Sequence, residues 1–179
     1  YWLPDEDRTV YETFNNDRPT GPQIRTQGNL AEARWPQAYA RAAQELGSVD
    51  PSAILFLGSA HATVEDNHLL TQLADAMGAD APQYIPHIEP GAGDDWLITD
   101  DKTPNAQGCE RLGIRAVDKQ MIRSKMEAGE IKIVYVLEDD PVAAGLFTEE
   151  QLKGVSVILH YYNTTHTTRP VADVALPPA

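Results

Sequence analysis

The run IKIVYVLEDDP, residues 131–141, constrains the fold of this chain more than any other stretch. Seven mostly apolar residues, rich in β-branched and aromatic types, lead directly into three acids and a proline, which is typical of a buried parallel strand that ends in a loop. In an open α/β sheet, ligands bind in the crevice at the carboxyl ends of the strands. Glu138, Asp139 and Asp140 are therefore predicted to lie at the functional edge of the domain. The alternative, which spacing alone favours, is that these acids only solvate a loop and begin a helix at Pro141.

Strand and helix patterns alternate through the rest of the chain. The segments 52–59 and 155–162 have the pattern of buried strands, and 174–176 that of a short one. Helical spacing with cap and stop signals predicts helices over 35–47, 63–78, 118–129 and 148–154, the first packing its Trp35 face on the sheet. Prolines restrict residues 84–88 to a short edge strand at best, and residues 91–113 are predicted to form a long loop.

This alternation predicts a doubly wound, three-layer α/β domain with a mostly parallel sheet of four or five strands. Residues 1–30 have little periodicity and several prolines and glycines, so they are expected to form an extended arm or a pair of short strands before the α/β domain of residues 31–179. The apolar start and the ending LPPA indicate a segment of a longer polypeptide.

Charge and cysteine content exclude several function classes. With 14 basic and 27 acidic residues, the net charge of −13 would repel nucleic acid and anionic lipid over most of the surface. No apolar run approaches the roughly 20 residues that span a bilayer, so any membrane association is expected to go through another protein. One cysteine, Cys109, cannot by itself hold an iron-sulfur cluster.

The residues alone predict neither a catalytic site nor a metal site. The histidine pairs His61 with His68 and His160 with His166 lack the spacing of zinc ligands, and the aspartates of residues 94–101 lack the pattern of a calcium loop. No nucleophile, base and oxyanion donors assemble in the sequence. A binding or scaffolding domain is therefore favoured over a catalyst.

Four segments together resemble the molybdopterin oxidoreductase family. They are FLGSAHATVEDNHLLTQLADAMGA, DDWLITDDKTPNAQGCERLG, IVYVLEDDPVAA and TTRPVADVALPPA, in the order found in that family, and FNNDRPTGPQIRTQGNLAEARWPQAYARAAQEL resembles the segment that introduces the domain. The pattern D-x-L-I-x-x-D-x-x-P-N-x-x-G, matched from Asp95 to Gly108, favours the large iron-sulfur subunits (the G subunits) of respiratory NADH:quinone oxidoreductases. In those subunits a molybdopterin-like domain follows the cluster-binding region.

The resemblance implies a set of cofactor-binding positions. In relatives that hold molybdopterin guanine dinucleotide, a small residue opens the turn against the nucleotide, and Glu138 takes its place here, followed by Asp140 two residues later. A carboxylate there costs a phosphate-bearing ligand about 1 kcal/mol or more. Gly58 and Ser59 match the first-strand turn of the family, so the resemblance implies a vestigial site.

The resemblance also implies a function. The expected role is a non-catalytic, structural domain of a respiratory complex, without a cofactor of its own, with iron-sulfur clusters only in a preceding region. Its partners would be other subunits, and it would be cytoplasmic and peripheral to the inner membrane. One alternative is the cofactor-binding part of an active enzyme, such as a formate dehydrogenase relative, in which Gly58, Ser59, Asn105 and Asp140 line the dinucleotide. Another is an acidic protein-interaction module.

Overall fold

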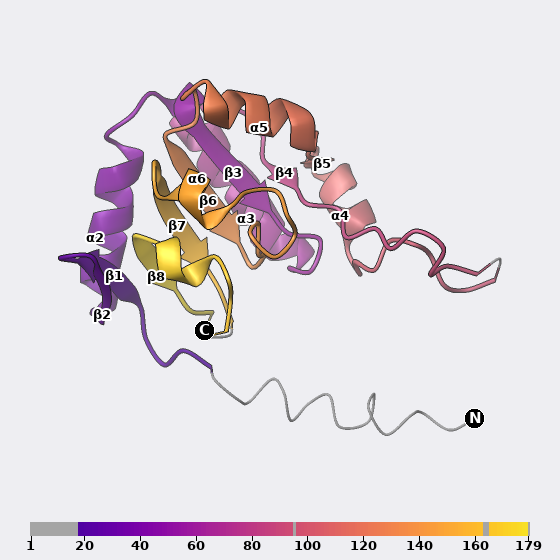
Figure 1. The fold of residues 1–179 in the computed structure, drawn as a ribbon, viewed down its shortest axis with the longest axis horizontal. Helices are drawn as coiled ribbons and strands as arrows, with labels where there is room; N and C mark the ends of the chain where they lie inside the picture. Colours follow the sequence, from indigo (N-terminus) through magenta and orange to yellow (C-terminus); the bar gives the residue numbers. More distant parts are fainter. Residues whose placement is uncertain (1–17, 95, 163–164, 179) are drawn as a thin grey trace.

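One mixed, mostly parallel sheet of eight strands forms the centre of the computed structural model, which describes residues 18–94, 96–162 and 165–178. The strand order is β2-β1-β8-β7-β6-β3-β4-β5, and the six strands from β8 to β5 are parallel, whereas β1 is antiparallel to both neighbours. The strands are β1 Gln23–Thr26, β2 Asn29–Glu32, β3 Ile54–Gly58, β4 Gln83–Tyr84, β5 Arg115–Ala116, β6 Ile133–Leu137, β7 Ser156–His160 and β8 Val174–Leu176 (Figure 1).

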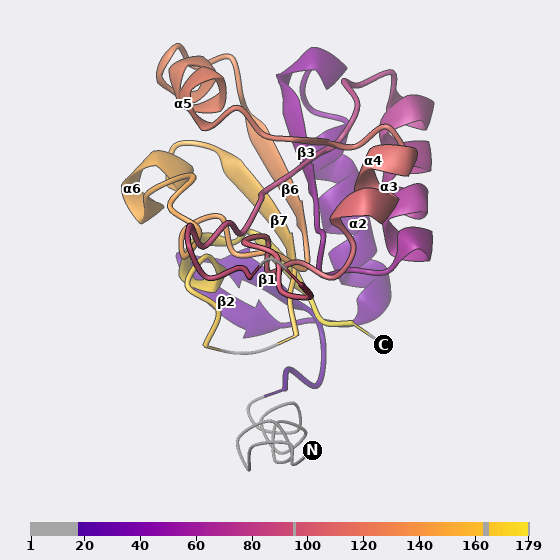
Figure 2. The same cartoon turned by 90° about the vertical axis from the view of Figure 1, so that its right-hand side faces the viewer.

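Helices cover both faces of this sheet, which confirms the predicted doubly wound α/β fold. They are α2 Trp35–Leu46, α3 Val64–Met77, α4 Ala106–Arg111, α5 Lys119–Glu127 and α6 Glu149–Leu152, with short 3-10 turns at Pro51–Ala53 and Arg169–Val171. Figure 2 shows α2 and α3 on one face and α5 and α6 on the other. None of the helices in the described ranges combines the length and apolar character needed to cross a bilayer.

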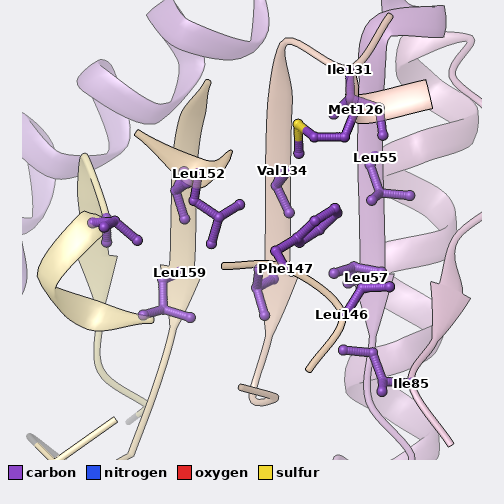
Figure 3. Packing of buried hydrophobic residues seen from close by; sticks show 14 of the residues in the cluster. Leu55, Leu57, Ile85, Met126, Ile131, Val134, Leu146, Phe147, Leu152 and Leu159 are labelled. Carbon is purple, nitrogen blue, oxygen red and sulfur yellow. The ribbon is translucent and has the colours of Figure 1, made fainter. Parts of the chain in front are cut away.

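The alternation of side chains along each strand divides the core into two layers. Leu55 and Leu57 of β3 face α5 and α6, whereas Ile54 and Phe56 face α2 and α3. Figure 3 shows the first layer, in which β3, β6 and β7 meet the segments around α5 and α6. Its labelled members are Leu55, Leu57, Ile85, Met126, Ile131, Val134, Leu146, Phe147, Leu152 and Leu159.

The predicted helix caps are confirmed. Thr63 accepts a hydrogen bond from the Asp66 amide at 3.1 Å, Asp118 accepts from the amides of Gln120 and Met121, and Thr148 accepts from the Gln151 amide. The end of α3 at Gly78 has a φ of 72°, which glycine adopts without strain. These local signals are strong because each satisfies backbone groups that the helix itself leaves unpaired.

The sheet has more strands than the four or five predicted. β4 and β5 have two residues each, too few for a periodic pattern. β1 and β2 are the pair of short strands that was one of the two expectations for residues 1–30, although β2 extends past that boundary to Glu32. Residues 1–17 of that arm lie outside the described residues. β4 pairs with both β3 and β5, so the edge position predicted for this segment is wrong.

Three local predictions also need correction. The predicted apolar face of α2 packs on the sheet only in part: Ala42 and Leu46 are buried, together with Ala38, whereas Trp35 and Tyr39 of the same face are exposed. The predicted loop of residues 91–113 contains α4. Residues 141–145 form turns after β6, closed by a hydrogen bond from the Ala144 amide to the Asp140 carbonyl, and no helix begins at Pro141.

Candidate functional site

The loops that follow β3 and β6 meet at the carboxyl edge of the sheet. The register pairs Leu57 with Val136, so Ser59 and Glu138 leave their strands side by side. Ser59 Oγ donates to the Glu138 carbonyl oxygen at 3.2 Å and accepts from the His61 amide at 3.0 Å. The structure thus brings two of the residues predicted as a site together, but the hydroxyl is already engaged by the backbone.

Gly58 is required by a buried asparagine that sequence reasoning missed. A Cβ atom at Gly58 would lie 2.6 Å from Oδ1 of Asn67, which is fully buried on α3. Asn67 Oδ1 accepts from the Ser59 amide at 3.1 Å, and its Nδ2 donates to the carbonyls of Ser59 and Thr63. The one signal in the sequence was a single polar residue on the buried face of an amphipathic helix.

Asn105, another of the predicted site residues, hydrogen-bonds to the loop after β3. Its amide N–H donates to the Ala60 carbonyl and its Nδ2 to the Ala62 carbonyl, both at 2.9 Å. Gly108 packs so closely on the Asn105 side chain that a Cβ atom there has no room. Asn105 therefore connects α4 to the loop after β3 instead of pointing to a ligand.

Glu138 has a backbone conformation that glycine favours. Its φ is +48°, one of two non-glycine residues with positive φ in the described part of the chain. Burial raises the pKa of the Glu138 carboxyl, and the nearby Asp66 raises it further. Glu138, which was predicted to crowd the turn, therefore has an unfavourable backbone conformation and an unfavourable environment for its negative charge.

Replacing Glu138 by glycine is expected to raise the free energy of unfolding by about 1 kcal/mol, because it removes the left-handed strain. Urea unfolding of the variant measures this change. Glu138→Ala is the matched control, since it removes the carboxylate but keeps the Cβ atom that causes the strain. Equal stability of the glycine and alanine variants would contradict the explanation.

Asp140 is bound internally rather than exposed to a ligand. Oδ2 accepts from the amide and hydroxyl of Thr167 at 2.6 and 2.8 Å, and Oδ1 accepts from the hydroxyl of buried Thr168 at 2.6 Å and from the Ala143 amide at 3.1 Å. Burial would raise the pKa of Asp140, but the hydrogen bonds and His166 outweigh it and the pKa is lowered. Asp140 therefore joins the loop after β6 to the segment before β8.

Asp139 and His87 form a second polar contact at this edge, which sequence reasoning missed. Asp139 is only 5% exposed, and its Oδ1 lies 3.1 Å from His87 Nε2. The hydrogen bond to Asp139 raises the pKa of His87, while burial and the adjacent His87 lower the pKa of His61. Within the described ranges, no group of three or more histidine, cysteine, aspartate or glutamate side chains is arranged to hold a metal ion.

An open groove of about 770 Å³ lies beside this edge, between α2 and α3 and above the ends of β6 and β7. Glu138 and Asp66 contribute the two carboxylates of its lining, and the remainder is aromatic, apolar or neutral. The other lining residues are Trp35, Tyr39, Leu69, Leu70, Leu73, Tyr135, Leu137, His160, Pro177 and Pro178.

Comparison with known proteins gives one partial likeness. No family model matches the sequence. A 78-residue stretch, 44% of this chain, is 32% identical to the G subunit of NADH-quinone oxidoreductase from Rickettsia conorii and, at the same identity and coverage, to that from Rickettsia felis. The stretch spans 12% of the length of each relative. Over somewhat less than half of its length, this protein is thus similar to a small part of the G subunits of NADH-quinone oxidoreductases.

Proposed function

We propose that this chain is a non-catalytic, molybdopterin-like structural domain of a respiratory NADH-quinone oxidoreductase, within its large iron-sulfur (G) subunit. The observation that carries the proposal is the likeness to two G subunit sequences at 32% identity. The doubly wound α/β fold is compatible with the domain that the resemblance implies. Iron-sulfur clusters would then lie in a region outside this chain.

The internal use of polar groups supports a structural role. The side chains of Ser59, Asn105 and Asp140 all hydrogen-bond to backbone groups of neighbouring loops. Groups bound in this way stabilise the loops at the carboxyl edge and cannot turn to a substrate without breaking these hydrogen bonds, of which those of Ser59 and Asn105 are partly buried. These hydrogen bonds accordingly favour a role in holding the loops in place over a role in catalysis.

The residues at the carboxyl edge do not fit the pyrophosphate of a pterin dinucleotide. A pyrophosphate is held by free backbone N–H groups, lysine or arginine. Here the Ser59 amide is already bonded to Asn67 and Glu138 presents a carboxylate, while none of the described residues that line the groove is a lysine or an arginine. This misfit supports a domain without a cofactor.

Partners and location follow from the same proposal. A domain of this kind would hold neighbouring subunits at fixed positions, on the cytoplasmic side of the inner membrane and attached through those subunits. The absence of a spanning helix among the described residues is compatible with such an attachment.

The proposal is tested by capturing the tagged chain from detergent-solubilised membranes of its host. NADH-oxidising activity and iron-sulfur signals in electron paramagnetic resonance are expected in the captured complex. The chain purified alone is expected to lack visible absorption and bound molybdenum. Stoichiometric molybdenum with a pterin in the purified chain would favour the active-enzyme alternative, and capture without any NADH-oxidising activity would contradict the respiratory assignment.

A further inference from the structure

Two aromatic side chains stand exposed over the groove between α2 and α3. Trp35 and Tyr39 lie one turn apart on α2, are 37% and 57% exposed, and have ring centroids 5.3 Å apart with planes inclined by 34°. Leu69 and Leu73 of α3 line the groove opposite. Aromatic faces carry a negative quadrupole that attracts cations, and arginine in particular stacks on them.

The floor of the groove is polar but uncharged at neutral pH. The hydroxyl of Tyr135 lies 2.7 Å from His160 Nε2. Burial raises the pKa of Tyr135 to about 12 and lowers the pKa of His160 to about 4. Neither residue therefore supplies a positive charge that could neutralise the carboxylates above it.

Glu138 projects a half-buried carboxylate that has no hydrogen-bond or ion-pair partner within the described part of the chain. Asp66, the second carboxylate, is bound to the Thr63 hydroxyl at 2.6 Å and lies close enough to repel Glu138. Two carboxylates in a partly desolvated groove are stabilised by a cation placed between them. The groove is thus complementary in charge to a cationic ligand and repels an anion.

We propose that the groove between α2 and α3 binds an arginine side chain of a partner polypeptide, with the guanidinium paired to Glu138 and stacked against Trp35 and Tyr39. A guanidinium presents a planar fork to a carboxylate and a flat face to aromatic rings, so it uses both features of the groove. The groove is much larger than one guanidinium and also has leucine and proline walls. Apolar residues beside the arginine fill that part, which favours a polypeptide over a free small cation.

The proposal concerns the groove alone and does not depend on which complex the chain joins. It is tested with the 179-residue chain carrying Trp2→Phe and Trp96→Phe, so that Trp35 is the only tryptophan. The probe is the peptide acetyl-Leu-Arg-Leu-amide, and its neutral counterpart contains citrulline in place of arginine. Binding is followed by Trp35 fluorescence at moderate salt.

The arginine peptide is expected to bind about tenfold more tightly than the citrulline peptide, as one charge-assisted pair would give. Glu138→Gln, which keeps the shape of the side chain, is expected to remove most of this difference. Asp75→Asn is the matched control, because it changes the net charge equally at an exposed position of α3 outside the groove, and it is expected to bind as the parent does. Tyr39→Ser, at an exposed position, is expected to weaken binding several-fold without unfolding the chain.

Three results would overturn the proposal. Equal affinity for the arginine and citrulline peptides would show that the groove does not recognise the positive charge of the guanidinium. An equal loss of affinity in Asp75→Asn and Glu138→Gln would show general attraction by an acidic protein rather than a site. Guanidinium ion alone binding as tightly as the peptide would make the groove a small-cation site and contradict a polypeptide partner.

Discussion

Replacing Asp140 by alanine is expected to lower the free energy of unfolding by about 2 kcal/mol, because it removes a partly buried charged acceptor of four hydrogen bonds. The substitution leaves the hydroxyl of fully buried Thr168 and the amides of Ala143 and Thr167 without their acceptor. It also releases the loop after β6 from the segment before β8. Urea unfolding at neutral pH measures the change.

Asp118→Ala is the matched control for Asp140→Ala. Asp118 also accepts from two backbone amides, but it is exposed and caps α5, so its loss is expected to cost about 1 kcal/mol. Asp140→Asn keeps the shape of the side chain without the charge and is expected to lie between the two. A loss at Asp140 no larger than at Asp118 would show that the loops hold together without this carboxylate.

Acid is expected to destabilise the protein through His160 by about 3 kcal/mol between pH 7 and pH 4. Burial lowers the pKa of His160 from 6.5 to about 4 in the folded protein. Between pH 7 and pH 4, His160 binds a proton more readily in the unfolded chain than in the folded protein, so the free energy of unfolding falls as the pH falls. Urea unfolding at a series of pH values measures the slope.

His160→Gln is expected to remove this part of the slope, because glutamine is neutral and can still hydrogen-bond the Tyr135 hydroxyl. Glu138 faces the same groove, and because its pKa is raised, its contribution to stability increases as the pH falls. Asp66 lies near both residues. Since both carboxylates are present in wild type and in His160→Gln, the difference between the two profiles reports on His160. Tyr135→Phe serves as the control: it removes the hydrogen bond and keeps the buried imidazole, so the slope should persist. Parallel profiles for His160→Gln and wild type would contradict burial as the cause.

The central strands and the helix boundaries could be predicted from the sequence because their signals are local. The apolar run that ends at Leu137 pairs in the middle of the sheet, and Thr63, Asp118 and Thr148 each cap the helix predicted for them. β5 could not be predicted, and β4 only as a possible short edge strand, since two-residue strands depend on pairing with their neighbours. The inward face of α2 was predicted correctly at Ala42 and Leu46 but wrongly at Trp35, because a large apolar residue is expected in the core even where a smaller alanine packs closer to the sheet.

In the candidate site, too, local features could be predicted from the sequence, whereas contacts between distant residues could not. The sequence indicated that Gly58, Ser59 and Glu138 lie where strands end, and the parallel register places the last two side by side. It gave no indication that Asn67 fastens the loop after β3, or that His87 reaches Asp139 across 52 positions of sequence. Such pairs have no local pattern, because only the packing of separate loops brings them together.

By itself, the sequence determined the α/β class, the order of the main strands and helices, the acidic surface and the carboxylates after β6, since each depends on residue type and short spacing. The tertiary structure alone decided what those carboxylates do: Asp140 and Asp139 are bound within the protein, while Glu138 faces a groove with aromatic walls without a partner in the described chain. The physical reason is that the state of a charged group depends on burial and on partners distant in sequence, and these exist only after the chain has folded.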